Sequence, residues 1–350
     1  MRLRYVATFL LGLNLLLIPM TDCGYAHHAR MHSGNLRAMI LALAVDPTRQ
    51  GVLYSGSFGR GVFKTTDGGN LWSAINDGLG SLYTRTLVID PSRPAILYAG
   101  TDDGLFKTTD SGRRWRQLAH GISNASIRCL VLDPSSTGTM YVGTGDGVWQ
   151  SMDGGLHWQP RKQGLTQLDV RALAIHPDNP QVLYAGTFGG VFKSSDAGAT
   201  WTVINQGLDD KLVRVLALAV DQPATLYAGT ALGGIFKLFT HENKWQPVSD
   251  GLVSRSILAL AWSPTPTPRL YAGTLDGIYS SDNRGRSWQY IKSSVRGLST
   301  TALSVDPATP SRLYAGSGGL IFISHNAGQD WTDISKWVLS SPGQSVQPLA

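Results

Sequence analysis

The chain has 350 residues with 40 glycines, 17 prolines and only two cysteines, and its formal net charge is +6. Hydrophobic residues make up 42% of the sequence, which excludes an intrinsically disordered chain, so the glycines indicate turns. Two cysteines exclude a small fold held together by a disulfide framework.

Residues 1–26 have the pattern of a secretory signal. Arg2 and Arg4 precede an apolar run over residues 5–20, and small residues lead up to Ala26. Cleavage after Ala26 predicts an exported protein, either periplasmic or extracellular. This location argues against nucleic acid as a partner.

Two alternatives to cleavage after Ala26 stay open. A lipid attached to Cys23 would tether the chain, although Asp22 directly before it fits a lipobox poorly, and an uncleaved signal would act as an anchor. After cleavage Cys129 is the only thiol. It lies in the strand-like segment IRCLVL and is expected to be a small buried hydrophobic residue.

Three histidines lie in the short N-terminal segment over residues 27–35. His27, His28 and His32, together with a free amine, form a combination that captures copper or nickel, but such a tract at a chain end is more often incidental. The other five histidines fall at unrelated points of the repeat described next. The sequence therefore predicts neither a metal site nor a cofactor.

Seven tryptophans between positions 72 and 331 recur at intervals of 43 or 44 residues, which indicates one structural unit copied seven times. Four of the preceding segments match S/T-x-D-x-G-x-x-W. The fifth has decayed, with Thr240 in place of the acid. The sixth is interpreted with Asp282 as its acid and one inserted residue, and the seventh has Asn326. The predicted structural residues are Asp67, Trp72, Asp110, Trp115, Asp153, Trp158, Asp196, Trp201, Asp282 and Trp288.

This motif predicts a tight turn between two strands. A short acid such as Asp67 bonds the backbone N–H groups of its own turn, Gly69 supplies a conformation that a Cβ disfavours, and Trp72 packs into the hydrophobic layer beyond. These segments resemble the Asp-box, or bacterial neuraminidase repeat, of β-propellers. The resemblance covers residues 36–335 and implies a structural role for the boxes.

The remainder of each unit is strand-like. In the fourth unit, strands are predicted over residues 170–177, 181–187, 189–195 and 200–205, between proline and glycine turns. Seven such units predict an all-β fold, a seven-bladed β-propeller of four-stranded antiparallel blades with Asp-box turns. The predicted blades cover residues 36–79, 80–122, 123–165, 166–208, 209–252, 253–298 and 299–335.

Each unit contains its own first and fourth strands, so no blade is divided between the two ends of the chain. Blades 1 and 7 are therefore expected to pack face to face. The C-terminal tail over residues 336–350, with Trp337, is a candidate latch across this seam.

Two further resemblances through the repeats suggest an enzyme. Sialidases need a glutamate-activated tyrosine and an F/Y-R-I-P segment, but Glu242 is the only glutamate and no such segment occurs. Xyloglucan-cleaving endoglucanases have similar repeats and use paired aspartates between two tandem propellers. The corresponding loops here carry Asp102, Asp103, Asp146 and Asp276, which are also ordinary turn residues. A glycoside hydrolase or carbohydrate-binding propeller stays the alternative, and no catalytic residue is predicted.

Arginines occupy one position in four consecutive blades. Arg85, Arg128, Arg171 and Arg214 each follow a box tryptophan by 13 residues and open the first strand of their blade. Since first strands line the channel of a propeller and begin at one rim, these side chains are expected to form a basic arc there. The arc either binds a partner or has a structural role, in which each arginine satisfies a neighbouring carbonyl or aspartate.

Single seven-bladed propellers with these boxes, a signal sequence and an arginine patch resemble the photosystem II assembly and stability factors of cyanobacteria and chloroplasts. The resemblance implies a non-enzymatic protein that binds partner polypeptides. The prediction is a monomeric exported scaffold whose basic arc binds a protein with an acidic surface or an anionic polymer. Any contact with a membrane is expected through the partner or an uncleaved N-terminus.

Overall fold

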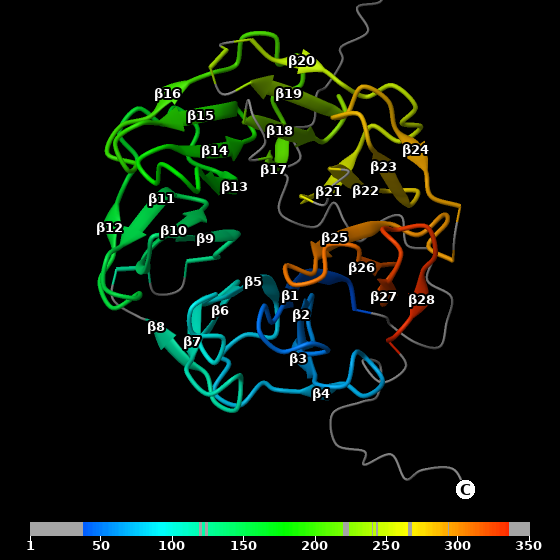
Figure 1. Cartoon of the computed structure of the whole chain (residues 1–350). Coiled ribbons are helices and arrows are strands. Elements are labelled where there is room, and N and C mark those ends of the chain that lie inside the picture. Colours follow the sequence, from blue (N-terminus) through cyan, green and yellow to red (C-terminus); the bar gives the residue numbers. More distant parts are fainter. Residues whose placement is uncertain are drawn as a thin grey trace, which may run out of the picture. The chain divides into compact units, whose positions relative to one another are not determined.

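The strands form seven separate four-stranded sheets. The structure is a computed structural model that describes residues 38–118, 121–122, 125–219, 224–239, 241–242, 244–264, 268–292 and 294–335. Every sheet is antiparallel, and its strands follow one another in chain order. The described residues contain no helix. The predicted all-β propeller of seven four-stranded blades is therefore confirmed (Figure 1).

The four strands of a blade run from the centre of the ring to its outside. The first strands are β1 (Ile40–Val45), β5 (Thr84–Ile89), β9 (Cys129–Asp133), β13 (Val170–Ile175), β17 (Val213–Ala219), β21 (Ile257–Ser263) and β25 (Thr300–Val305). The second strands are β2 (Leu53–Ser57), β6 (Leu97–Thr101), β10 (Ser136–Thr144), β14 (Leu183–Thr187), β18 (Thr225–Thr230), β22 (Arg269–Thr274) and β26 (Leu313–Ser317). The third strands are β3 (Gly61–Thr65), β7 (Gly104–Thr108), β11 (Gly147–Ser151), β15 (Gly190–Ser194), β19 (Ile235–Phe239), β23 (Ile278–Ser281) and β27 (Leu320–Ser324). The fourth strands are β4 (Ser73–Ala74), β8 (Arg116–Leu118), β12 (Gln159–Pro160), β16 (Thr202–Val203), β20 (Gln246–Pro247), β24 (Gln289–Tyr290) and β28 (Thr332–Asp333).

The first strands form a closed circle. β1 contacts β5, and each first strand contacts the next until β25 contacts β1 again (Figure 1). A first strand pairs only with the second strand of its own sheet, so its other edge faces the middle of the ring. The fourth strands have only two or three residues, which leaves little sheet edge exposed for pairing with other chains.

A glycine in every second strand allows neighbouring blades to pack. A Cβ on Gly229 would lie 2.5 Å from Cγ2 of Ile257, a first-strand residue of the next blade. The same close approach to the next blade occurs at all seven boundaries, at Gly56, Gly100, Gly143, Gly186, Gly229, Gly273 and Gly316. The recurring L-Y-A-G sequence is thus explained, because its tyrosine fills the core and its glycine makes room for the next blade.

The ring closes between blade 7 and blade 1 without a shared sheet. Near the centre, a Cβ on Gly316 would lie 2.8 Å from Cβ of Ile40. On the outside, the indole N–H of Trp72 donates a hydrogen bond to the Ile334 carbonyl at 2.8 Å. The expected face-to-face packing of the first and last blades is therefore observed.

Candidate functional site

The acid of each repeated turn organises the connection between the third and fourth strands. In blade 1, Asp67 Oδ1 accepts hydrogen bonds from the N–H of Leu71 at 3.0 Å and from the Thr65 hydroxyl at 2.7 Å. That hydroxyl accepts a third bond from the N–H of Gly69 at 3.0 Å. The same three bonds recur around Asp110, Asp153 and Asp196. Each acid thus holds its own turn.

In blade 6 the acceptor is Asn283, so the choice of Asp282 from the sequence is wrong. Asn283 Oδ1 accepts hydrogen bonds from the Ser281 hydroxyl at 2.9 Å and from the N–H of Ser287 at 3.0 Å. Asn283 precedes Trp288 by five residues, which is the spacing of the acid in the other boxes, and no residue is inserted. This spacing was the signal in the sequence that identifies the acceptor.

A carboxamide forms this turn as a carboxylate does. In blade 7, Asn326 Oδ1 accepts a hydrogen bond from the N–H of Asp330 at 2.9 Å. Where the acceptor is an aspartate, these bonds favour the ionised form, and the Leu71 N–H group lowers the pKa of Asp67 below its ordinary value of 3.8. Hydrogen bonds within the turn also lower the pKa of Asp110, Asp153 and Asp196.

We expect the box aspartates to make the protein sensitive to acid. A carboxyl group with a lowered folded-state pKa stabilises the fold fully above its unfolded-state pKa, and this contribution disappears as the pH falls through the folded-state pKa. A variant with asparagine at positions 67, 110, 153 and 196 should keep nearly the parent melting temperature at pH 7. Between roughly pH 4 and pH 2 its melting temperature should fall less than that of the parent.

Thermal unfolding followed by circular dichroism measures both quantities. The matched control replaces four exposed aspartates elsewhere by asparagine and so removes the same charge, at Asp77, Asp103, Asp178 and Asp209. Equal acid sensitivity of the two fourfold variants would contradict a role of the box carboxylates.

The box tryptophans connect each box to the preceding blade. Trp115 is 2% exposed, and its indole N–H donates a hydrogen bond to the Ile75 carbonyl of blade 1 at 2.6 Å. Equivalent bonds to the preceding blade are made by Trp72, Trp201, Trp245 and Trp288. Bonds within their own turns are made by Trp158 and Trp331. All of these contacts lie within the ring.

The structure places the four arginines of the arc at corresponding points of blades 2 to 5. Arg85, Arg171 and Arg214 are the extra residues of β-bulges near the starts of β5, β13 and β17. A bulge turns a side chain out of the regular alternation of the strand. Arg128 has the same place directly before β9. These positions bring each side chain to the rim at which first strands begin.

Groups of the ring contact the first and last arginines of the arc. Both terminal oxygens of Asp102 accept hydrogen bonds from the Arg85 guanidinium, one of them from Nη2 at 3.2 Å. Asp102 also accepts a hydrogen bond from the Ser126 hydroxyl at 2.9 Å. Arg214 Nη1 donates to the Ser256 hydroxyl of blade 6 at 2.9 Å. The contact of Arg85 with Asp102 is of the kind that the structural alternative describes, whereas Arg214 contacts a hydroxyl group.

Asp169 lies between the two central arginines. It forms ion pairs with Arg128 of blade 3 and with Arg171 of blade 4, the latter at 2.8 Å. The guanidinium carbon of Arg171 also lies 4.4 Å from the centre of the Phe188 ring. The side chains of Arg128 and Arg171 are 16% and 22% exposed, so both remain accessible from the rim. Asp169 lies two residues before Arg171, which was a local signal in the sequence, but 41 residues after Arg128, so its contact with Arg128 had no such signal.

Large hydrophobic side chains are exposed on the same rim. Phe58 and Tyr83 are each 43% exposed, and their ring centroids lie 4.7 Å apart in an edge-to-face contact. Because successive strands alternate in direction, the loops between second and third strands and the connections between blades share the rim with the first-strand starts, opposite the box turns. We call the following exposed residues, with the four arginines, the rim surface: Phe58, Leu82, Tyr83, Leu232, Val253 and Leu275. No motif in the sequence marks these residues.

Three of the four loop aspartates considered for catalysis have local partners. Asp102 holds an arginine of the arc. Asp146 contacts Lys162 Nζ at 3.1 Å, and Asp276 accepts a hydrogen bond from the Tyr279 hydroxyl at 2.9 Å. These contacts are the ones expected of turn residues.

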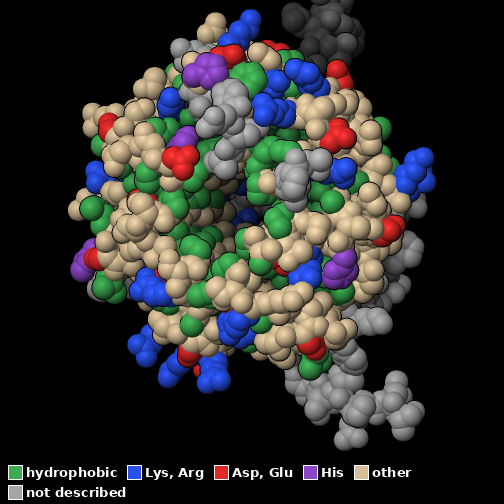
Figure 2. Space-filling model, viewed as in Figure 1, with side chains coloured by type: hydrophobic (Ala, Val, Ile, Leu, Met, Phe, Trp, Pro, Cys, Tyr) green, Lys and Arg blue, Asp and Glu red, His purple; other side chains and the backbone are tan. Residues whose placement is uncertain are grey.

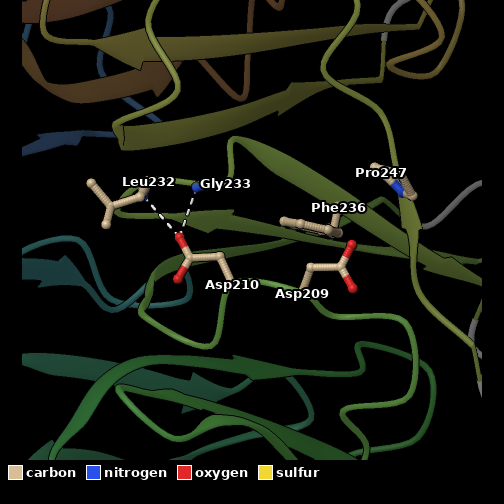
Figure 3. A pocket seen from close by; sticks show the side chains of 6 residues that line it. All are labelled: Asp209, Asp210, Leu232, Gly233, Phe236 and Pro247. Carbon is tan, nitrogen blue, oxygen red and sulfur yellow. Dashed lines mark hydrogen bonds between the residues drawn. The ribbon is translucent and has the colours of Figure 1, made fainter.

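An open hollow of about 510 Å³ lies on the rim side of blade 5 and is lined by Asp209, Asp210, Leu232, Gly233, Phe236 and Pro247 (Figure 3). Burial disfavours the ionised Asp210 carboxylate, but hydrogen bonds from backbone N–H groups outweigh it and hold the pKa of Asp210 below its ordinary value. Two of these bonds, from Leu232 and Gly233, are 2.8 and 2.7 Å long. Figure 3 shows the carboxylates of Asp209 and Asp210 pointing apart, so they do not face each other as an acid–base pair.

Cys129 is partly buried against the core shared by blades 3 and 4, and burial raises the pKa of its thiol to about 12.

The described residues include no group of three or more histidine, cysteine, aspartate or glutamate side chains placed to hold a metal ion. In the same part of the chain, no helix has the length and hydrophobicity needed to span a membrane. The predicted signal segment and the tail lie outside the described residues, as do His27, His28, His32, Thr240 and Trp337.

No protein-family model and no curated protein matches the chain. Among solved structures, the GH74 xyloglucanase from Xanthomonas campestris matches with a TM-score of 0.67 and 15% identity, over 86% of this chain and 55% of that one. YCF48 bound to D1 peptide matches with a TM-score of 0.63 and 17% identity, over 82% of this chain and 93% of that one. The extracellular domain of a hybrid two component system from B. thetaiotaomicron matches with a TM-score of 0.68 and 19% identity, over 84% of this chain and 39% of that one.

These similarities establish the fold, because identities this low carry no information about activity. The chain spans about half the length of the GH74 enzymes and nearly the full length of YCF48. It is a seven-bladed β-propeller whose structural neighbours include both GH74 enzymes and YCF48.

Proposed function

We propose that the chain is a non-enzymatic exported scaffold that binds a partner polypeptide through the rim surface. The observation that carries the proposal is that six large hydrophobic side chains are exposed on the one rim that also carries the arginine arc. Apolar side chains gathered on one surface and interspersed with polar groups are typical of protein interaction sites. Tyrosine and arginine are also the residues that most often dominate binding energy.

The arginine arc gives the rim surface a preference for acidic partners. Arg85 pairs with Asp102, and Arg128 and Arg171 pair with Asp169, while Arg214 donates to the Ser256 hydroxyl. These carboxylates also fix the orientation of the arginine side chains, which lowers the entropy that binding costs. YCF48 supports the idea, since it binds a peptide with a similar ring.

We interpret the repeated turns as Asp-boxes with a structural role. Their acids bond their own turns and five of their seven tryptophans bond the preceding blade, on the edge opposite the rim surface. A glycoside hydrolase remains the second candidate, supported by the GH74 neighbours. The endoglucanases that these repeats resemble form their cleft between two propellers, and the described residues of this chain form one.

The proposal is tested by capture of proteins from the envelope fraction with the native chain and two triple variants. The rim variant carries Tyr83→Ser, Leu232→Ser and Val253→Ser. The matched control carries Leu71→Ser, Met152→Ser and Leu156→Ser. These three residues are also apolar and exposed, but they lie on the box edge, the side of the ring that carries the box turns. A specific partner should be lost, by roughly tenfold or more in affinity, with the rim variant only. Its binding to the native chain should weaken with salt.

Replacing the arginines of the arc by glutamate is a weaker test than the rim variant. Glutamate at position 85 or 128 would lie beside Asp102 or Asp169 and would destabilise the ring by charge repulsion. A partner retained at native strength by the rim variant would contradict the scaffold proposal. Hydrolysis of xyloglucan by the native chain that disappears in Asp103→Asn or Asp209→Asn would favour the glycosidase instead.

A further inference from the structure

The box turn of blade 2 carries three exposed arginines, Arg113, Arg114 and Arg116. Within the described residues, their guanidinium groups take part in no hydrogen bond or ion pair. Figure 2 shows lysine and arginine side chains gathered at the periphery of this face, in the region where Figure 1 places β8. The three arginines therefore concentrate positive charge on the edge opposite the rim surface.

Two lysines beneath these arginines add to the charge. Lys107 lies directly opposite Arg116 in the ladder between β7 and β8, so both side chains lie on the same face of the sheet. Its ammonium group donates to the Gly154 carbonyl in the box of blade 3 at 3.1 Å. In blade 1, the ammonium group of Lys64 likewise donates to a backbone carbonyl in the box of blade 2, at 3.1 Å. Burial, then Arg49 and Arg113, lowers the pKa of Lys64, which shows how closely the cations are placed.

The acids nearby offset only part of this cluster. Asp110 contributes one negative charge, which acts on Arg113 and on Lys64. Asp46 and Asp90 are buried, and each pairs with an arginine of its own loop, Arg49 at 2.7 Å and Arg93 at 2.9 Å. The charges of Arg113, Arg114 and Arg116 are left facing solvent.

Hydrophobic side chains project from the boxes on either side. Leu71 of blade 1 is 55% exposed and occupies the box position of Arg114, directly before the tryptophan. In blade 3, Leu156 is 55% exposed at the box position of Arg113, and Met152 is 70% exposed. The corresponding pairs of residues in blades 4, 6 and 7 are polar or small, namely Ala199 and Thr200, Arg286 and Ser287, and Gln329 and Asp330.

From this arrangement we infer that the box edge of blades 1 to 3 binds the surface of a lipid bilayer that contains anionic headgroups. Arginine forks bond phosphate oxygens, and projecting leucine and methionine side chains enter the boundary between headgroups and acyl chains. A soluble polyanion would use the arginines but would leave the three apolar side chains in water. The inference is independent of the proposed function, because the rim surface lies on the other edge and stays open to a partner.

The test is sedimentation of the full chain with vesicles of phosphatidylcholine containing about one third phosphatidylglycerol, compared with pure phosphatidylcholine. The charge variant carries Arg113→Gln, Arg114→Gln and Arg116→Gln, and the apolar variant carries Leu71→Ser, Met152→Ser and Leu156→Ser. The control variant removes three exposed arginines of blade 6, Arg255→Gln, Arg286→Gln and Arg296→Gln, and so has the same net charge as the charge variant. All chains share the N-terminus, so any difference between them comes from the substitutions.

The native chain and the control variant should prefer the anionic vesicles, and this preference should fall as salt rises. The charge variant should lose roughly tenfold to a hundredfold in affinity for them, and the apolar variant should bind more weakly at every salt concentration. Equal binding by the charge variant and the control variant would overturn the inference. So would arginine-dependent binding of soluble polyphosphate without binding of anionic vesicles. The rim variant should bind vesicles as the native chain does, which separates this result from failure of the scaffold proposal.

Discussion

Replacing Trp72 by alanine is expected to lower the free energy of unfolding by about 3–5 kcal/mol, because a buried aromatic side chain is lost at the seam of the ring. Trp72 is 4% exposed and packs in a cluster with residues of blades 1 and 7, including Phe63 and Ile323. Its loss also leaves the Ile334 carbonyl without its indole donor. Denaturant unfolding followed by circular dichroism measures the change.

A second tryptophan provides the matched control. Trp288 is also 4% exposed and donates to the Val248 carbonyl at 2.8 Å, but between blades 5 and 6, which the chain connects. Both alanine variants should lose stability. Hydrogen exchange should accelerate in β1–β4 and β25–β28 only for Trp72→Ala, because no covalent link holds blade 7 to blade 1. Native exchange rates in those strands would show that the seam does not depend on Trp72.

Gly229→Ala is expected to cost about 1–3 kcal/mol although it adds a single methyl group. The new Cβ would lie 2.5 Å from Ile257 and 2.7 Å from Val215, inside the packed boundary between blades 5 and 6. At Gly138, by contrast, the nearest atom to a new Cβ is the Met152 carbonyl oxygen at 3.7 Å, so Gly138→Ala should change stability by less than about 0.5 kcal/mol. The melting temperatures of the two variants should therefore differ, and equal values would mean that the boundary can expand.

The fold was predictable because a blade is built from consecutive residues. Hairpins pair strands that are close in sequence, so the tryptophan period, the turn residues and the alternation specify each sheet locally. The same is true of the box turns, where the distance from Trp288 identifies Asn283 as the acceptor. The error at Asp282 came from matching residue type before spacing.

The candidate site was predictable only in part. The shared position of Arg85, Arg128, Arg171 and Arg214 follows from the repeat, and the structure places them at one rim. Their contacts do not follow from it, since Asp169 joins two blades and becomes a neighbour of Arg128 only when blades 3 and 4 pack. The exposed rim residues belong to loops of different length and composition, which carry no period.

The sequence by itself determined the number of blades, the strands of each blade and the turn that joins the outer two, because these depend on contacts within about forty residues. Only the tertiary structure decided what lies between blades. It assigned each L-Y-A-G glycine a neighbour in the next blade, and it gave the arginines their carboxylates. It also separated the rim surface from the box edge. The physical reason is that side-chain contacts across blade boundaries depend on the packing and curvature of the closed ring, and local propensity does not encode them.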